Sequence, residues 1–150
     1  MRLSEAVGLL KENIILDDSI PHVIIQSHPW RSLKTKGSAR VVPLVGVALL
    51  ASKRLLGGDS SYAFPSYCGH AGCKANSASG ALNKWLKPRV RSGGVVHSFR
   101  HSIRDRLRAV ECPSDVIDQI GGWSSGKAGE AYVAGHNSDA LLRYVIQIDG

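Results

Sequence analysis

Long apolar runs are missing from this sequence. No stretch approaches the ~20 apolar residues that a membrane-spanning helix needs, and the N-terminus lacks the basic-then-apolar order of a secretory signal peptide. Internal repeats, low-complexity segments and an obvious interdomain linker are missing as well. These absences favour one cytoplasmic protein with no membrane partner.

Cysteine is scarce. Cys68, Cys73 and Cys112 form an odd set in a chain that we expect to be intracellular, so the sequence predicts reduced thiols rather than a disulfide framework. Cys68, His70 and Cys73 offer three possible metal ligands, but their spacing matches no standard zinc pattern and no fourth ligand is evident. We therefore expect no metal site.

Apolar residues and positive charge are both plentiful. The chain has 150 residues, of which 43% are hydrophobic and 21% charged, a composition typical of a folded globular protein. This length suits one domain with a sizeable core, so we expect a single globular unit over residues 1–150. The formal net charge of +7 indicates a polyanionic partner, with nucleic acid first among the candidates.

The spacing of apolar residues predicts an α+β fold, mostly helical with a small antiparallel three-stranded sheet. β-branched runs separated by polar loops predict strands at 13–16, 21–27 and 39–44. Residues 59–72 predict a loop partly packed against the core. Apolar residues three or four apart predict a short helix that begins almost immediately after the N-terminus and further helices at 45–56, 74–87, 96–110, 114–120 and 138–148.

The helix at 96–110 carries the strongest chemical signal. Its predicted buried face runs from Val96 through Phe99 to Val110. His97 and Arg100 lie on a neighbouring face, where a guanidinium fork and an imidazole donor can hold one anion together, such as a phosphodiester. The alternative is a solvated basic face on a buried helix.

A turn and a tyrosine follow this helix. The turn reads Ile120-Gly-Gly-Trp123-Ser-Ser, and Tyr132 lies nine residues beyond Trp123 in a loop rich in glycine and alanine. The His97-Ser-Phe-Arg100 box, the turn and the tyrosine, in this order, resemble the catalytic domain of the tyrosine recombinases, the phage-integrase family. Trp123 stands where that family usually has histidine and where some members have tryptophan.

Two segments nearer the N-terminus extend the resemblance. Arg2 and Glu5 have the separation of the family's Gly-x-Arg-x-x-Glu pattern, for which an ordinary surface ion pair is the alternative. The run from Lys34 to Leu44 resembles the β-hairpin that holds the family's catalytic lysine, so Lys34 is the expected lysine and Lys36 the reserve. The alternative is a solvated hairpin tip that attracts phosphates nonspecifically.

The resemblance implies site-specific DNA recombination, in the form of integration or excision, by strand cleavage and rejoining. Tyr132 would attack the scissile phosphate to give a 3′-phosphotyrosine and a free 5′-hydroxyl, while Arg2 and Arg100 clamp the phosphate. Lys34 would protonate the leaving oxygen. The bond energy stays in the phosphotyrosine, so the step is reversible, and the chemistry requires no metal or other cofactor.

The resemblance gives auxiliary roles to three more residues. His97 would assist proton transfer or donate a hydrogen bond to the phosphate, and Trp123 would donate its indole N–H or pack beside the phosphate. Glu5 would support the site without reacting. We expect these side chains to converge with the arginines on one basic cleft.

Double-stranded DNA is the expected partner. Lys36, Lys84, Lys87 and Arg89 are candidates for contacts to its backbone, although the last three also fit a merely solvated helix end. The resemblance also implies a tetramer of protomers on paired sites, with the terminal helix at 138–148 exchanged in trans, and association with the nucleoid when bound to DNA.

Two other functions compete with recombination. One is a noncatalytic DNA-binding remnant with an incomplete site, and the other is DNA relaxation of the type IB topoisomerase kind. The lack of a Gly-Lys-Ser/Thr phosphate loop disfavours a phosphotransferase that acts on something other than DNA. Family members also have an N-terminal DNA-binding domain, and the start at Arg2 leads us to expect a C-terminal catalytic domain without that domain and without its own first helices.

Overall fold

The computed structural model describes residues 1–34, 38–90, 93–123 and 136–149. About 47% of the described residues are helical, and a small three-stranded antiparallel sheet accompanies the helices. The predicted α+β class is therefore confirmed.

The sheet consists of strands β1 (Ile14–Ile15), β2 (His22–Ile25) and β3 (Arg40–Pro43), in that spatial order. Val23 of β2 lies opposite Ile14 on one side and Val42 on the other, so β-branched residues pair across the whole sheet. The strands occupy the predicted positions but are shorter than the apolar runs that predicted them.

The helices also lie close to their predicted ranges. Helix α6 begins where the side chain of Asn137 accepts a hydrogen bond from the Ala140 N–H (2.9 Å), a typical N-cap. None of the helices in the described ranges is both long and apolar enough to cross a membrane. The helices are α1 (Leu3–Val7), α2 (Gly46–Leu55), α3 (Ala75–Leu86), α4 (Ser98–Ala109), α5 (Ser114–Gly121) and α6 (Ser138–Val145), with short 3₁₀ turns η1 (Lys11–Asn13) and η3 (Ile146–Ile148).

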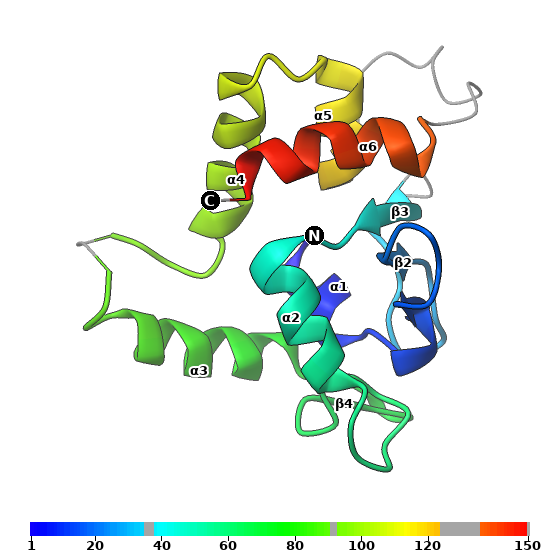
Figure 1. Cartoon of the computed structure of the whole chain (residues 1–150). Helices are drawn as coiled ribbons and strands as arrows, with labels where there is room; N and C mark the ends of the chain where they lie inside the picture. Colours follow the sequence, from blue (N-terminus) through cyan, green and yellow to red (C-terminus); the bar gives the residue numbers. More distant parts are fainter. Residues whose placement is uncertain (35–37, 91–92, 124–135, 150) are drawn as a thin grey trace.

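Helices α4, α5 and α6 share one apolar core. Leu107, Val116 and Leu141, one from each helix, are almost completely buried there. Val42 of β3 packs against the same core and so joins it to the sheet. Figure 1 shows these three helices grouped at the top, with the N-terminus just below them.

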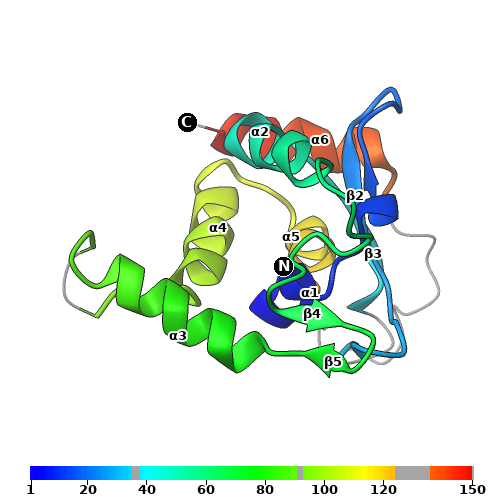
Figure 2. The ribbon, with the colours of Figure 1, turned by 90° about the horizontal axis from the view of Figure 1, so that it is seen from below.

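Two further apolar clusters surround α1 and the sheet. Val7 of α1 packs with Tyr62 and with Ala78 of α3, while Val23 and Leu44 belong to the third cluster. Seen from below, α1 lies near the middle of the molecule, between α5 and the strands β4 (Cys68–Gly69) and β5 (Gly72–Cys73) (Figure 2). Residues at the start of α1 are therefore next to the α4–α6 group.

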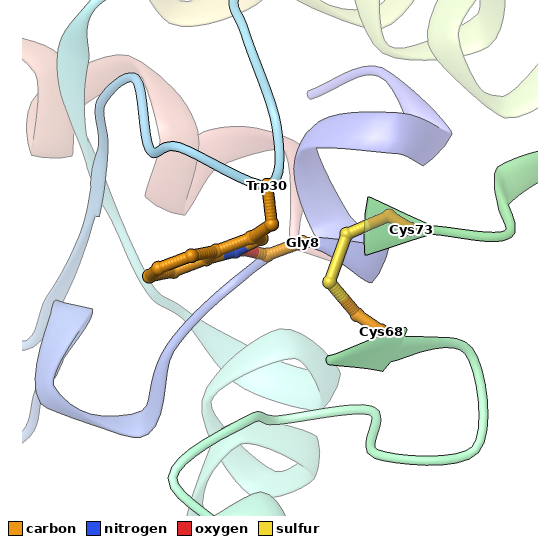
Figure 3. Close-up of a disulfide and its surroundings, with 4 residues drawn as sticks. All are labelled: Gly8, Trp30, Cys68 and Cys73. Carbon is orange, nitrogen blue, oxygen red and sulfur yellow. A yellow bond between two sulfur atoms is a disulfide. The ribbon is translucent and has the colours of Figure 1, made fainter. Parts of the chain in front are cut away.

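The segment predicted to be a loop contains a disulfide-bonded hairpin. Cys68 and Cys73 are cross-strand partners in β4 and β5, with their Cα atoms 4.2 Å apart, so the prediction of reduced thiols is wrong for this pair. Strands of two residues show no alternating pattern, which is why the sequence did not reveal them. Figure 3 shows the bridge close to Gly8, whose carbonyl oxygen accepts a hydrogen bond from the indole of Trp30 (3.3 Å).

The burial of the apolar faces of α4 and α6 differs from expectation. Phe99 is 61% exposed, whereas Arg100 beside it is only 7% exposed, so the inward face of α4 includes the arginine rather than the phenylalanine. The stripe of Leu141, Val145 and Ile148 is buried within its own chain. These three side chains therefore do not need a neighbouring protomer to cover them.

Candidate functional site

The site begins at the first turn of α1. The backbone N–H of Arg2 donates to Oε2 of Glu5 (2.7 Å), and Nη1 of Arg2 donates to Oε1 (2.9 Å). A glutamate at the third helical position can reach back to the N-cap in this way. Glu5 is only 2% exposed and the Arg2 side chain is 23% exposed, so the pair is more buried than an ordinary surface ion pair.

A second arginine, which the sequence analysis did not assign to the site, also binds Glu5. Nη2 of Arg40, in β3, donates to Oε2 of Glu5 (2.8 Å), and Nε of Arg40 donates to the carbonyl oxygen of Ile120 (3.2 Å). Burial alone would raise the pKa of Glu5, but hydrogen bonds from Arg40 and Arg2 outweigh it and lower the pKa from 4.5 to about 2. Glu5 is therefore an anion that links α1 to the sheet.

The turn after α5 has the geometry of a Schellman motif. The N–H of Trp123 donates to the carbonyl of Asp118 (3.0 Å), and the N–H of Gly122 donates to that of Gln119 (3.3 Å). Gly122 has a φ of 62°, in the left-handed region that favours glycine. A Cβ at this position would also collide with the guanidinium of Arg40. The turn therefore requires glycine for two separate reasons.

This turn points a carbonyl oxygen at two arginines that are far apart in the sequence. The carbonyl oxygen of Gly122 accepts hydrogen bonds from Nη2 of Arg2 (3.1 Å) and from Nη2 of Arg100 (3.5 Å). The beginning of α1, the first turn of α4 and the end of α5 therefore meet at one backbone group.

Arg100 is buried but incompletely hydrogen-bonded. Burial, followed by the nearby charge of Arg2, lowers the pKa of Arg100 from 12.5 to about 10, so the guanidinium remains charged at neutral pH. Its Nη1 is buried and has no hydrogen-bond partner among the described residues. Buried donors are normally satisfied, so an unsatisfied donor beside a pocket is a candidate contact for a ligand.

That pocket has a volume of about 290 Å³ and is lined by Arg2, His97 and Arg100. His97 is exposed at the start of α4, with its ring 5.1 Å from the ring of His101. The structure therefore brings together the two arginines and the histidine of the predicted site. The rest of the lining is apolar: Met1, Leu3, Ala6, Val96, Phe99 and Ile103.

Trp123 lies directly beside this group. The guanidinium carbon of Arg100 is 4.3 Å from the centre of its ring, and that of Arg104 is 5.0 Å away. A guanidinium stacked on an indole is attracted by the ring and held in a defined plane. Trp123 therefore lies next to Arg100, although it does not line the 290 Å³ pocket.

Positive charge exceeds negative charge in this part of the protein. Arg2, Arg40 and Arg100 surround one carboxylate, Glu5. Arg31 adds a fourth charge: burial lowers its pKa, Glu5 opposes that shift, and all three guanidinium nitrogens are buried without a hydrogen-bond partner in the described ranges. Such an excess favours binding of an anion.

The remaining predicted residues lie elsewhere. Lys34 is exposed in the connection between β2 and β3. Lys84, Lys87 and Arg89 are exposed at the end of α3, where Arg89 stacks on Trp85 at 4.3 Å. None of these four side chains lines the 290 Å³ pocket. Two predicted site residues fall outside the described residues: Lys36 and Tyr132.

The comparison with protein families agrees with this geometry. The model of the phage integrase family matches residues 1–138, nearly the whole chain. The chain belongs to the phage integrase family. No curated protein and no solved structure gave a match. Membership indicates a DNA-binding protein of the tyrosine recombinase kind.

Two arginines at the site of this phage integrase family member, Arg40 and Arg31, were not predicted from the sequence. Arg40 lies within the run from Lys34 to Leu44, on the same face of β3 as Val42, which packs against the core of α4, α5 and α6. Alternation along this strand could therefore have indicated that Arg40 points toward the protein interior. No pattern in the sequence predicts the burial of Arg31, since this residue lies in a short isolated bridge with His28 and not in a strand.

Proposed function

We propose that this phage integrase family member carries out site-specific DNA recombination by cleaving and rejoining DNA strands through a 3′-phosphotyrosyl intermediate. The observation that carries the proposal is the convergence of Arg2 and Arg100 on one carbonyl and on one pocket, which His97 also lines. The two arginines come from opposite parts of the chain. Such convergence is expected of a binding site and is not needed for a solvated basic face.

A phosphodiester fits this arrangement in charge and in shape. It has one negative charge and two nonbridging oxygens, which two guanidinium groups can bind together. The excess of arginine over carboxylate leaves positive charge for it, and Nη1 of Arg100 has an unused hydrogen-bond donor in the described structure. The same groups would stabilise the additional charge of the pentacovalent transition state.

Glu5 and Arg40 would act as supports. Glu5 binds Arg2 through both the backbone and the side chain, and Arg40 fixes Glu5 from the sheet. Preorganised donors stabilise charge without rearranging during the reaction. The carboxylate would therefore orient Arg2 without contacting DNA.

The reaction itself would follow the order implied by the motifs. The phenolate oxygen of Tyr132 attacks phosphorus, the bond from phosphorus to the 5′-oxygen breaks, and Lys34 donates a proton to that oxygen. Attack by a 5′-hydroxyl on the phosphotyrosine reverses the step and joins a new pair of strands. His97 would donate a hydrogen bond to a nonbridging oxygen or assist proton transfer, while Trp123 would donate its N–H or pack beside the phosphate.

The DNA duplex would extend beyond the pocket. Lys84, Lys87 and Arg89 would contact its backbone from the end of α3, together with Lys36. We further propose that protomers assemble as a tetramer on paired sites. Exchange of residues 138–148 in trans would require this segment to leave the packing that it makes within its own chain.

Covalent capture tests the proposal. A nicked suicide substrate loses its cleaved end by diffusion, so the phosphotyrosine accumulates and can be seen as a shifted band on a denaturing gel. We expect capture by the unaltered protein and by Tyr144→Phe, which serves as the matched control, but none by Tyr132→Phe, which lacks only the hydroxyl.

The competing functions give different results. A noncatalytic remnant would bind DNA without capture by any variant. A type IB topoisomerase would relax supercoiled plasmid without a defined site or a second duplex. Capture by Tyr132→Phe would contradict the assignment of the nucleophile.

A further inference from the structure

Arg104 lies one helical turn beyond Arg100 on α4 and stacks on the same indole. The guanidinium carbons of Arg100 and Arg104 are 4.3 Å and 5.0 Å from the Trp123 ring centre. Residues four apart on a helix point in nearly the same direction, so one aromatic ring can contact both. Neither the family motifs nor the proposed mechanism gives Arg104 a role.

Asp118 of α5 binds both Arg104 and Trp123. Nη2 of Arg104 is 3.7 Å from a carboxylate oxygen of Asp118, whose backbone carbonyl accepts the N–H of Trp123 (3.0 Å). Asp118 therefore holds both the arginine and the tryptophan. The side chain of Asp118 is 18% exposed and that of Arg104 is 38% exposed, so the ion pair is partly shielded from water.

Space around the indole is restricted as well. A Cβ added at Gly121 would collide with the Trp123 ring, so the ring lies flat against the end of α5. Arg100 itself has only a long hydrogen bond from Nη2 to Gly122 (3.5 Å), and its Nη1 has no partner in the described residues. The stacked ring is thus a principal contact that defines the plane of the Arg100 guanidinium.

We propose that Arg104, anchored by Asp118, is a positioning residue that holds Trp123 against Arg100 and so orients the phosphate-binding guanidinium. The role rests on the proposed function, because it concerns the arginine that would bind the scissile phosphate. The attraction between a guanidinium and the face of an indole favours the stacked orientation of the Arg100 side chain over others.

Three variants test this role. Arg104→Ala removes the stacking and the ion pair, and Arg104→Lys keeps the charge but not the planar group. Arg108→Ala is the matched control, since Arg108 is an exposed arginine on the same helix whose closest ion pair is with Asp105 (3.8 Å). Each protein is labelled with 5-fluorotryptophan, and the ¹⁹F resonance of Trp123 is identified by its loss in Trp123→Phe.

Two measurements are then compared. We expect Arg104→Ala and Arg104→Lys to shift or broaden the Trp123 resonance and to lower the single-turnover rate of covalent capture by about ten- to a hundredfold, since misplaced catalytic groups cost rates of that order. DNA affinity should change by less than about threefold in Arg104→Ala, which loses one charge, and by no more than that in Arg104→Lys, which keeps it. Arg108→Ala should match the unaltered protein in both measurements.

The outcomes separate this inference from the proposed function. A Trp123 resonance unchanged in Arg104→Ala, a capture rate unchanged in Arg104→Ala, or full activity in Arg104→Lys would each overturn the positioning role. If the unaltered protein captured no DNA, the proposed function would fail. The ¹⁹F spectrum would then decide alone whether Arg104 holds Trp123.

Discussion

At the scale of single residues, the site depends on one buried carboxylate. Glu5 is bound by Arg2 and by Arg40, and these bonds join the first helix to the last strand of the sheet. The sequence predicted the separation of Arg2 and Glu5 but not the second arginine, because Arg40 approaches from β3 through tertiary packing. Spacing rules describe only contacts within one element.

Glu5→Gln should destabilise the protein at neutral pH. The pKa of Glu5 is lowered from 4.5 to about 2, so its ionised form stabilises the fold above pH 4.5, and this contribution is lost as the pH falls toward 2. We expect a loss of about 3 kcal/mol in the free energy of unfolding at pH 7 that becomes smaller below pH 4. Denaturant titrations at pH 7 and at pH 3 measure this loss.

Glu12→Gln provides the control, because Glu12 is an exposed glutamate on η1. Its unfolding free energy should stay within about 0.5 kcal/mol of the unaltered protein. Equal effects of the two substitutions, or a Glu5→Gln deficit that persists unchanged at pH 3, would contradict the buried ion-pair network.

Gly122→Ala should also destabilise the protein, for two reasons that can be separated. Gly122 and Gly58 both have positive φ, at 62° and 78°, but only Gly122 has a neighbour, Arg40, in the way of a Cβ. We expect Gly58→Ala to cost about 1 kcal/mol from backbone strain and Gly122→Ala at least about 1 kcal/mol more. Thermal unfolding of both variants measures the difference, and equal costs would mean that Arg40 does not pack against the turn.

At the scale of elements, the sequence predicted most of the fold. Helices α2 to α6 and the three-stranded sheet have clear periodicity and lie where expected. Two features lacked such a signal. The β4–β5 hairpin is too short for a pattern, and the inward face of α4 is set by contacts with Trp123 and Gly122, which bury Arg100 and leave Phe99 exposed.

Thiol titration tests the hairpin. Cys68 and Cys73 are bonded to each other, Cys112 is the free cysteine, and burial raises the pKa of Cys112 to about 11. Native protein should therefore react very slowly with an aromatic disulfide reagent at pH 8, since the thiolate is the reactive form. Denatured protein should release one equivalent, and denatured, reduced protein three, in line with its cysteine content. Three equivalents without reduction would contradict the disulfide.

At the scale of the whole molecule, the net charge of +7 predicts DNA binding that depends on salt. Lys84→Gln with Lys87→Gln should weaken binding for all sequences and reduce the slope of log affinity against log salt by about 2, one for each lost phosphate contact. Lys53→Gln with Arg54→Gln is the control, because it removes the same amount of charge from two exposed basic residues at the end of α2. Fluorescence anisotropy at several salt concentrations gives both slopes, and identical slopes would remove the end of α3 from the DNA interface.

The sequence predicts those residues of the candidate site that belong to local motifs. It does not predict the residues that reach the site only through tertiary packing. The His97 and Arg100 box, the Trp123 turn and Arg2 could be read from spacing, and the structure brings them together. Arg40 joins them from β3, Arg104 through the packing of α4 on α5, and Arg31 lies in the connection between β2 and β3. Helical spacing relates Arg104 to Arg100, but no rule of spacing relates Arg31 or Arg40 to the residues of the motifs.

The central claim is that the Arg2 and Arg100 cluster holds a scissile phosphate for attack by Tyr132. Mass spectrometry of the protein–DNA adduct tests it most directly: protein trapped on a suicide substrate is digested with protease and nuclease, and the modified peptide is sequenced. We expect the residual nucleotide on the Tyr132 oxygen through a 3′-phosphate, and no adduct with Arg100→Ala. An adduct on another residue, or a linkage through a 5′-phosphate, would contradict the account.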